Sequence, residues 1–393
     1  MALNFLPARR RTVLAAIIAF FTASSLYAQG LPSRVRPADF PFARDEALGG
    51  AHTGLDGDFS SIFTNPAALV GVAPQKTIAK IAANINYIDI FHRMLKACDA
   101  TRLLPVLFVS HLEAEANIGG PLGLGMIGNN FGFGLFNVTR LGLDWDKNDL
   151  FMLSPKLTEE IILAGSYGLR LYEGEVSVLD MGFTVKGFFR AGFNYPPVYL
   201  QEIKYILQNL MERAFETQLG AGVDIGFRWT LADSLSFAVV FYDPYSPVWV
   251  VQYSKADNIL NQETIGNGVV PVTARARMGV SWRIKSLFLD RFFSGVTLSC
   301  DYTGMLDNLF ETSRDPLLNI GAGLEICMHE VFSIRGGFRD MLPAGGLRLD
   351  FTFMNVEISV YGREFGNKPG QFTAWASAID FTFKQRAGGR SKI

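Results

Sequence analysis

Apolar and polar residues alternate with a period of two along most of the chain between residues 77 and 383. In 272–284 the apolar set is Val272, Ala274, Ala276, Met278, Val280, Trp282 and Ile284, and the opposite set is Thr273, Arg275, Arg277, Gly279, Ser281 and Arg283. The stretches 179–189, 221–229, 320–328, 332–338, 347–353 and 379–383 alternate in the same way. Charge confined to one face of such strands is typical of membrane β-strands with one face toward lipid and one toward a lumen.

The connections between these stretches support a barrel. We expect strands at 77–88, 113–128, 130–145, 157–171, 175–192, 218–230, 235–246, 270–284, 294–304, 315–328, 331–340, 344–353, 355–364 and 371–383. Long connections, such as 192–217 and 246–269, tend to alternate with short ones, such as 128–130 and 231–234. This arrangement predicts an all-β fold: a transmembrane antiparallel barrel of about 14 strands, with both termini in the periplasm.

A soluble β-sandwich would show the same period, but two features favour the barrel. Many stretches are longer than the five or six residues that are usual for a globular strand. Glycines also recur on the expected inward face, where a plug inside the barrel would need room: Gly132, Gly134, Gly182, Gly226, Gly279, Gly321 and Gly323.

The segment 47–72, ahead of the first strand, shows neither a strand period nor a helix period. Glycines, including Gly49 and Gly50, allow tight turns at little steric cost. Asp58 or Ser60 is suited to cap a short helix, and Asn65-Pro66 is typical of a turn that ends one. A compact, turn-rich segment directly before a barrel predicts a plug for its lumen.

Residues 63–69, Phe-Thr-Asn-Pro-Ala-Ala-Leu, follow this glycine-rich lead. The run resembles the N-terminal hatch of the FadL-like outer-membrane transporters, whose signature would correspond to Asn65, Pro66 and Ala67. The resemblance implies a barrel of the same strand number that takes up long-chain fatty acids or other hydrophobic compounds. It leaves open whether the motif packs passively or takes part in gating.

The N-terminus has the pattern of a secretory signal peptide. Arg9, Arg10 and Arg11 precede an apolar run at 12–21, and cleavage is expected after Ala28, with Ser25 as the alternative. We therefore expect a signal peptide at 1–28, a hatch at 29–75, a barrel at 76–383 and a polar tail at 384–393. The expected location is the bacterial outer membrane, with the lipid bilayer and the outer-membrane assembly machinery as partners.

Composition narrows the function classes. The chain has 36 basic and 37 acidic residues, which argues against nucleic-acid binding. His52, His92, His111 and His329 are scattered without metal-site spacing, and no nucleophile elbow or phosphate loop is present. We expect no enzymatic activity, no metal and no cofactor.

Candidate ligand-binding residues come from the inward face and from one long loop. An inward arginine, of which Arg275, Arg277, Arg335 and Arg348 are candidates, could hold a solute carboxylate, or could serve in cross-strand ion pairs. A helix expected at 198–215 places Ile203, Leu207 and Leu210 on one apolar face. That face could contact ligand or pack on the rim of the barrel.

Two function hypotheses follow. The first is passive uptake of hydrophobic solutes: capture at the loops, passage beside the hatch, and escape through an opening in the barrel wall, as the FadL-like resemblance implies. The alternative is a surface-exposed barrel that acts as an adhesin or secretion partner.

Strand parity also makes two local predictions. The last strand ends at Phe383, pairs with the first strand, and directs Trp375, Ile379, Phe381 and Phe383 toward lipid. No disulfide joins Cys98, Cys300 and Cys327, because Cys300 faces lipid and Cys327 faces the lumen.

Overall fold

The computed structural model describes residues 34–38, 40–86, 111–120, 123–146, 152–194, 198–199, 212, 214–261, 263–285, 293–306, 314–328, 331–364, 366–371 and 373–386. The strands are β1 (Gln75–Asn86), β2 (His111–Gly119), β3 (Leu124–Gly128), β4 (Phe131–Asp146), β5 (Met152–Glu173), β6 (Ser177–Asn194), β7 (Val198–Tyr199), β8 (Phe215–Leu231), β9 (Leu235–Tyr245), β10 (Pro247–Tyr253), β11 (Thr264–Pro271), β12 (Arg275–Arg283), β13 (Gly295–Thr303), β14 (Ile320–Met328), β15 (Phe332–Arg339), β16 (Leu342–Asp350), β17 (Met354–Glu364) and β18 (Thr373–Arg386). The helical elements are α2 (Ala43–Ala47), α6 (Asn258–Asn261) and the 3₁₀ turns η2 (Phe59–Ile62), η3 (Pro66–Leu69) and η6 (Pro316–Asn319). None of the helices described here is long and apolar enough to cross a membrane.

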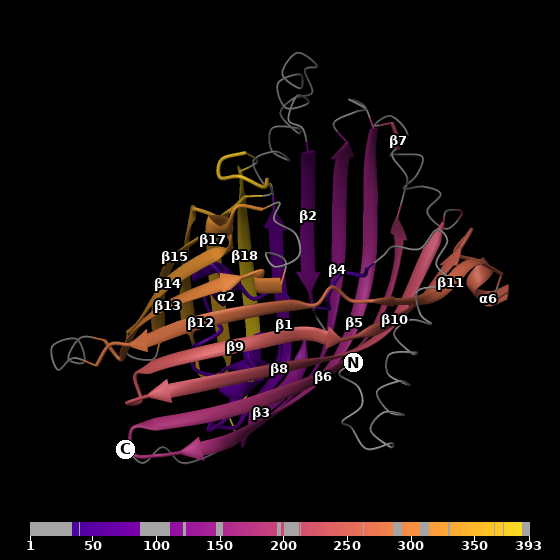
Figure 1. Cartoon of the computed structure of the whole chain (residues 1–393). Coiled ribbons are helices and arrows are strands. Elements are labelled where there is room, and N and C mark those ends of the chain that lie inside the picture. The colour runs from indigo at the N-terminus through magenta and orange to yellow at the C-terminus, as the bar shows by residue number, and fades with distance from the viewer. Residues whose placement is uncertain are drawn as a thin grey trace, which may run out of the picture.

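The strands form a closed antiparallel barrel (Figure 1). Closure comes from β18, which pairs with β17 on one side and with β1 on the other. Three pairs of segments, β2 with β3, β9 with β10 and β11 with β12, each share one place in the ring. The two-residue β7 pairs only with β5 among the described residues. The described strands therefore occupy fourteen places, which confirms the predicted fold class.

The barrel wall has an apolar outer face and a polar inner face. One row across β15, β16, β17 and β18 joins the paired residues Ile334, Leu347, Ile358 and Ile379. The first three are 39–47% exposed and point outward. The adjacent row joins Ser333, Arg348, Glu357 and Asp380 on the inner face. This is the alternation expected of a wall between lipid and a polar lumen.

Short hairpins link the strands at the expected turns. Asn129 and Asn130 have φ angles of 53° and 67°, and Ala232 and Asp233 have φ angles of 48° and 51°. Two consecutive positive φ angles are typical of type I′ turns, whose twist matches that of the flanking strands. The tight connections predicted at 128–130 and 231–234 are thus present.

Several strand ends differ from the predictions by a few residues, for example β5, which begins at Met152, and β14, which begins at Ile320, and three differences are larger. The connection at 246–269 is not a long loop, because β10 and β11 pair through it with Val248 and Val250 buried on the inner face. Glycines at 266 and 268 and prolines at 247 and 271 weaken the apolar pattern there. The last strand runs past Phe383 to Arg386, because Lys384 continues the inward parity and pairs with Asp350.

The third difference is that the strand predicted at 113–128 is divided into β2 and β3. Gly120, which follows β2, has a φ of +98°, a backbone conformation that favours glycine. In the loop expected to be helical at 198–215, residues 198–199 form β7 and Phe215 begins β8. Ile203, Leu207 and Leu210 lie outside the described residues.

Neither Cys300 nor Cys327 forms a disulfide. In the β13–β14 register, Cys300 pairs with Ala322 and Cys327 pairs with Gly295. Cys300 is exposed, and Cys327 is partly buried. The absence of a Cys300–Cys327 bridge is confirmed, and Cys98 lies outside the described residues.

The outward row at Ile358 gives a test of membrane placement. Ile358→Arg should lower the free energy of unfolding in liposomes by about 2–4 kcal/mol, because charge on the lipid face is costly near the middle of the bilayer. Ile358→Leu, which keeps the side chain apolar, should change it little. Denaturant titration of the folded barrel measures the difference, and equal stability of the two variants would contradict a lipid-facing role for this row.

Candidate functional site

Residues 34–38 and 40–72, here called the luminal segment, contact the inner faces of several barrel strands. α2 contacts β15, β16, β17 and β18, whereas η3 contacts β5, β6 and β8. η2 contacts β4 and β5. Since these strands belong to opposite parts of the ring, the segment spans the lumen from wall to wall.

One group of wall glycines lets the start of the luminal segment touch the wall backbone. A Cβ added at Gly321 would lie 2.3 Å from the carbonyl oxygen of Gly49. A Cβ at Gly323 would lie 2.7 Å from the carbonyl oxygen of Leu48. Real Cβ atoms do not approach so closely, so only glycine fits at these positions on β14.

A second group of wall glycines receives the motif that the sequence singled out. A Cβ at Gly182 on β6 would lie 2.3 Å from the backbone nitrogen of Ala67. A Cβ at Gly226 on β8 would lie 2.2 Å from the side-chain oxygen of Asn65. The backbone of the motif thus rests directly on the barrel wall.

Most inward glycines predicted to make room for a plug contact the luminal segment. They are Gly132, Gly182, Gly226, Gly279, Gly321 and Gly323. Gly134 differs, because the space beside it is filled by the ring of Phe136, a residue of the wall itself.

The motif residues also fix the local backbone. The side chain of Asn65 accepts a hydrogen bond from the backbone of Ala67 at 3.0 Å and donates one to the carbonyl oxygen of Thr53 at 2.8 Å. Asn65 is therefore the N-cap of η3, with Pro66 at its first position. The predicted turn begins a helical turn instead of ending one, whereas Asp58 caps η2 as expected.

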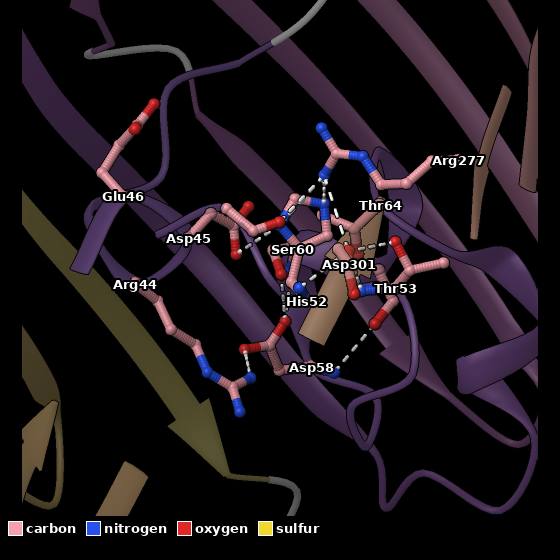
Figure 2. Close-up of polar contacts among 12 residues, drawn as sticks. Arg44, Asp45, Glu46, His52, Thr53, Asp58, Ser60, Thr64, Arg277 and Asp301 are labelled. Atoms are coloured by element: carbon pink, nitrogen blue, oxygen red, sulfur yellow. Dashed lines mark hydrogen bonds and ion pairs between the residues drawn. The ribbon is translucent and has the colours of Figure 1, made fainter. Parts of the chain in front are cut away.

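A polar anchor attaches residues 50–53 to β12 and β13 (Figure 2). Asp301 accepts hydrogen bonds from the backbone of His52 at 3.1 Å and of Thr53 at 3.0 Å, and from the Thr53 hydroxyl. Arg277 lies 2.6 Å from His52 Nε2 and donates to the carbonyl oxygen of Gly50 at 3.2 Å. A buried carboxylate that accepts several such bonds is well compensated for its lost hydration.

A second set of ion pairs connects α2 and η2 to the wall. Arg44 binds Asp58 at 2.5 Å and Glu325 at 2.8 Å. Arg335 binds Glu325 at 2.6 Å and Glu357 at 3.1 Å. Although burial opposes ionisation, the Arg44 charge and hydrogen bonds from Ser60 hold the pKa of Asp58 at about 2.

Burial favours the uncharged forms of Asp45 and His52. Burial, together with the charge of Asp58, raises the pKa of Asp45 to about 8. Burial and the nearby Arg277 lower the pKa of His52 well below its ordinary value. Because a guanidinium can only donate, Nε2 of His52 must accept and Nδ1 must carry the hydrogen that faces Asp45, 3.6 Å away.

The four arginines proposed as carboxylate ligands are engaged with the protein. Arg335 pairs with Glu325 and Glu357, and Arg348 pairs with Asp350 at 2.6 Å and with Glu357 at 3.5 Å. Arg277 belongs to the anchor beside His52. The Arg275 guanidinium lies 5.3 Å from the centre of the Tyr242 ring. Arg335 and Arg348 therefore make cross-strand ion pairs, whereas Arg277 contacts the luminal segment and Arg275 contacts an aromatic ring.

Opposite the ion pairs, the lumen holds an apolar cluster that the sequence reading missed. Its aromatic rings are Phe40, Phe42, Phe59 and Phe63 of the luminal segment and Phe136 and Phe188 of the wall, with aliphatic side chains of β4, β5, β10 and β11 around them. Ring centroids within the cluster are 4.9–6.1 Å apart. One sequence feature could have indicated this cluster: four phenylalanines lie within residues 40–63, which is unusual for a loop.

The cluster reaches the wall where β2 gives way to β3. Thr77 of β1 pairs with Gly125, and Ala82 pairs with Gly119, but the described residues of β2 and β3 offer no partner to β1 residues 78–81. The ring of Phe40 lies at this interruption, 2.5 Å from the place of a Cβ on Gly119. The apolar side of the lumen therefore adjoins the place where the described residues of β2 and β3 do not pair with β1, and where Gly120 and Gly123 lie close to the carbonyl oxygen of Lys80.

No protein-family model and no curated protein matches the chain. Solved structures of similar fold include a "CymD monoaromatic hydrocarbon channel", at 10% identity and a TM-score of 0.48 over 88% of this chain and 97% of that one. The Pseudomonas putida toluene transporter TodX has 8% identity and a TM-score of 0.48 over 88% of this chain and 98% of that one. A Pseudomonas aeruginosa FadL homologue has 10% identity and a TM-score of 0.42 over 91% of this chain and 99% of that one. Likeness at this level says nothing about the solute of this chain.

The close backbone contacts predict which glycines cannot be replaced. Gly182→Ala and Gly226→Ala should displace the luminal segment and raise the permeability of the barrel to small sugars in liposome swelling. Gly165→Ala is the matched control on β5, because nothing lies within 4 Å of its Cβ position. Unchanged permeability in both Gly182→Ala and Gly226→Ala would contradict close packing of the motif.

The raised pKa of Asp45 predicts a pH dependence. Since this pKa lies above the ordinary carboxyl value, the contribution of Asp45 to stability is present below about pH 4 and is lost as the pH rises toward 8. Protease sensitivity of the luminal segment should therefore rise with pH across this window in the native protein, and rise less in Asp45→Asn.

Asp58→Asn serves as the control of opposite sign, because the pKa of Asp58 is lowered. Loss of the Asp58 carboxylate should increase the protease sensitivity of the luminal segment already at neutral pH, because the native carboxylate is charged there and paired with Arg44. Identical pH profiles for Asp45→Asn and the native protein would contradict a buried, protonated Asp45.

Proposed function

We propose that this chain is a bacterial outer-membrane channel for the passive uptake of hydrophobic solutes. The observation that carries the proposal is the apolar cluster inside the lumen, which extends to the wall at Phe40 and Gly119. A polar solute channel would instead require a continuous hydrated lumen. The resemblance of residues 63–69 to the FadL-like hatch supports the same class of solute.

The proposed route leaves the barrel sideways. Toward the periplasm, the luminal segment is held against β6 and β8 by glycine contacts and against β12–β14 by hydrogen bonds and ion pairs. We infer that a solute in the apolar cluster leaves between β2 and β3, where the described residues of these strands do not pair with β1 residues 78–81. Exit there would deliver it into the bilayer without exposing it to water, which is favourable for an apolar molecule.

Within this class, uncharged solutes fit better than fatty acids. A carboxylate entering the apolar cluster needs a cationic partner, because burying an unpaired charge is costly. Arg335 and Arg348 already pair with protein carboxylates, and Lys80, beside Phe42, pairs with Asp380. Long-chain fatty acids therefore remain the less favoured substrates of the proposed channel.

The aromatic residues of the outer face support placement in the outer membrane. Trp229, Trp282 and Phe353 are exposed near the short-turn end of the barrel. Trp249 and Trp375 are exposed toward the other end. Two such groups of aromatic side chains are typical of the interfacial girdles of membrane barrels.

We propose that this chain has no enzymatic activity. The Nε2 atom of His52 is occupied by Arg277, so it is not available as a general base. The hydroxyl of Ser60 donates to Asp58 at 2.6 Å and is not paired with a histidine. These contacts stabilise the luminal segment and do not form a nucleophile–base pair.

The test places a charge at the proposed exit. Phe40→Glu should reduce the uptake of N-phenyl-1-naphthylamine by cells with an intact lipopolysaccharide layer, because a carboxylate at Gly119 makes the apolar route polar. Phe40→Leu, which keeps the route apolar, should retain most of the uptake. No uptake by the native protein, relative to cells without the barrel, would contradict the proposal and favour the surface-barrel alternative.

A further inference from the structure

One ring of the wall is central to the apolar cluster. Phe136 on β4 is fully buried. Its centroid lies 5.3 Å from that of Phe40, 5.6 Å from that of Phe59 and 4.9 Å from that of Phe63. Three rings of the luminal segment therefore pack on a single ring of the barrel wall.

The wall around Phe136 is built to seat this ring. The position two residues before it is Gly134, and a Cβ there would lie 2.4 Å from the Phe136 ring. Gly134 pairs with Ala164 of β5, and Phe136 pairs with Ile162. Gly134 and Ala164 are small and lie between Phe136 and the nearby turn. The Phe136 ring is therefore the largest side chain that this part of the wall directs into the lumen.

Phe136 is also fixed in position. β4 pairs continuously with β5 from Phe131 to Trp145, and it pairs on its other side with β2 and β3. Both neighbours hold the backbone of β4, and the three rings of the luminal segment pack on the Phe136 ring, so the ring stays directed into the lumen. A solute that moves through the cluster toward the interruption at Gly119 must fit against it.

We propose that Phe136 determines the cross-section of the solutes that the channel admits. The inference rests on the proposed function and adds the residue that sets its size limit. In the native protein the ring restricts passage to narrow apolar molecules. Shortening it leaves an apolar space of phenyl size, and such spaces accept planar hydrocarbons.

The test compares two uncharged planar probes of different width, naphthalene and pyrene. Initial uptake is measured in cells with an intact lipopolysaccharide layer, relative to cells without the barrel. Phe136→Ala should raise the ratio of pyrene to naphthalene uptake by about tenfold, the discrimination that small differences in an apolar pocket provide. Phe136→Leu should give an intermediate ratio, and Phe136→Trp should lower it.

Phe133→Ala is the matched control, because Phe133 lies on the same strand, faces outward and is 38% exposed. The ratio of pyrene to naphthalene uptake in Phe133→Ala should equal that of the native protein. Heat-modified gel mobility verifies that each barrel is folded, and Phe136→Leu decides the question if Phe136→Ala does not assemble.

The possible failures are distinguishable. If the native barrel takes up neither probe, the proposed function is wrong. If it takes up naphthalene but the ratio is the same in every folded Phe136 variant, the channel stands and the role of Phe136 is overturned. An equal change in Phe133→Ala would also overturn it, because the effect would then follow from general loosening of β4.

Discussion

Direct contact between two backbones determines how this barrel is filled. At Gly182, Gly321 and Gly323 the backbone of the luminal segment approaches the wall so closely that no side chain fits between them, and at Gly226 the Asn65 side chain occupies the place of a Cβ. Such contact requires glycine in the wall and a compact, locally capped turn in the segment. The N-cap at Asn65 and the turn at Gly49 supply that geometry on opposite sides of the lumen.

The two sides of the lumen then differ in chemistry. On the side of β12–β17, buried carboxylates such as Asp301 and Glu325 are bound by the luminal segment and by wall arginines. On the side of β4–β6, phenyl and aliphatic groups of the luminal segment and the wall pack together, beside the buried ion pairs of Glu160 with Arg140 and Arg190. Removing one partner of a buried pair costs several kcal/mol, about 3–5 by typical measurements, whereas apolar contacts can be exchanged for those of a solute. The apolar contacts of the segment are therefore the ones whose partners a solute can replace most easily.

The sequence predicted much of the fold, because each strand carries its own period of two and each short turn carries its own chemistry. The inward-facing glycines were predictable from the same period, because charged residues two positions away, such as Arg228 and Arg277, mark the inward face of the strand. The site depends instead on distant pairs: Thr53 binds Asp301, 248 positions away, and Lys80 binds Asp380, 300 positions away. No local pattern indicates which inward arginine meets which carboxylate. The interruption after Gly119 was missed because the strand on each side of it keeps its alternation.

The pairing of β1 with β18 has a consequence for assembly. These strands come from the two ends of the barrel sequence, so the ring cannot close until nearly the whole chain is available. The luminal segment precedes β1, so it is enclosed if it already lies between the walls at closure, and otherwise it must enter through an end of the barrel. A chain truncated before β18 would keep two unpaired strand edges, and exposed edges are templates for aggregation. The β1–β18 contact is therefore the step that both encloses the lumen and removes the last exposed edges of the sheet.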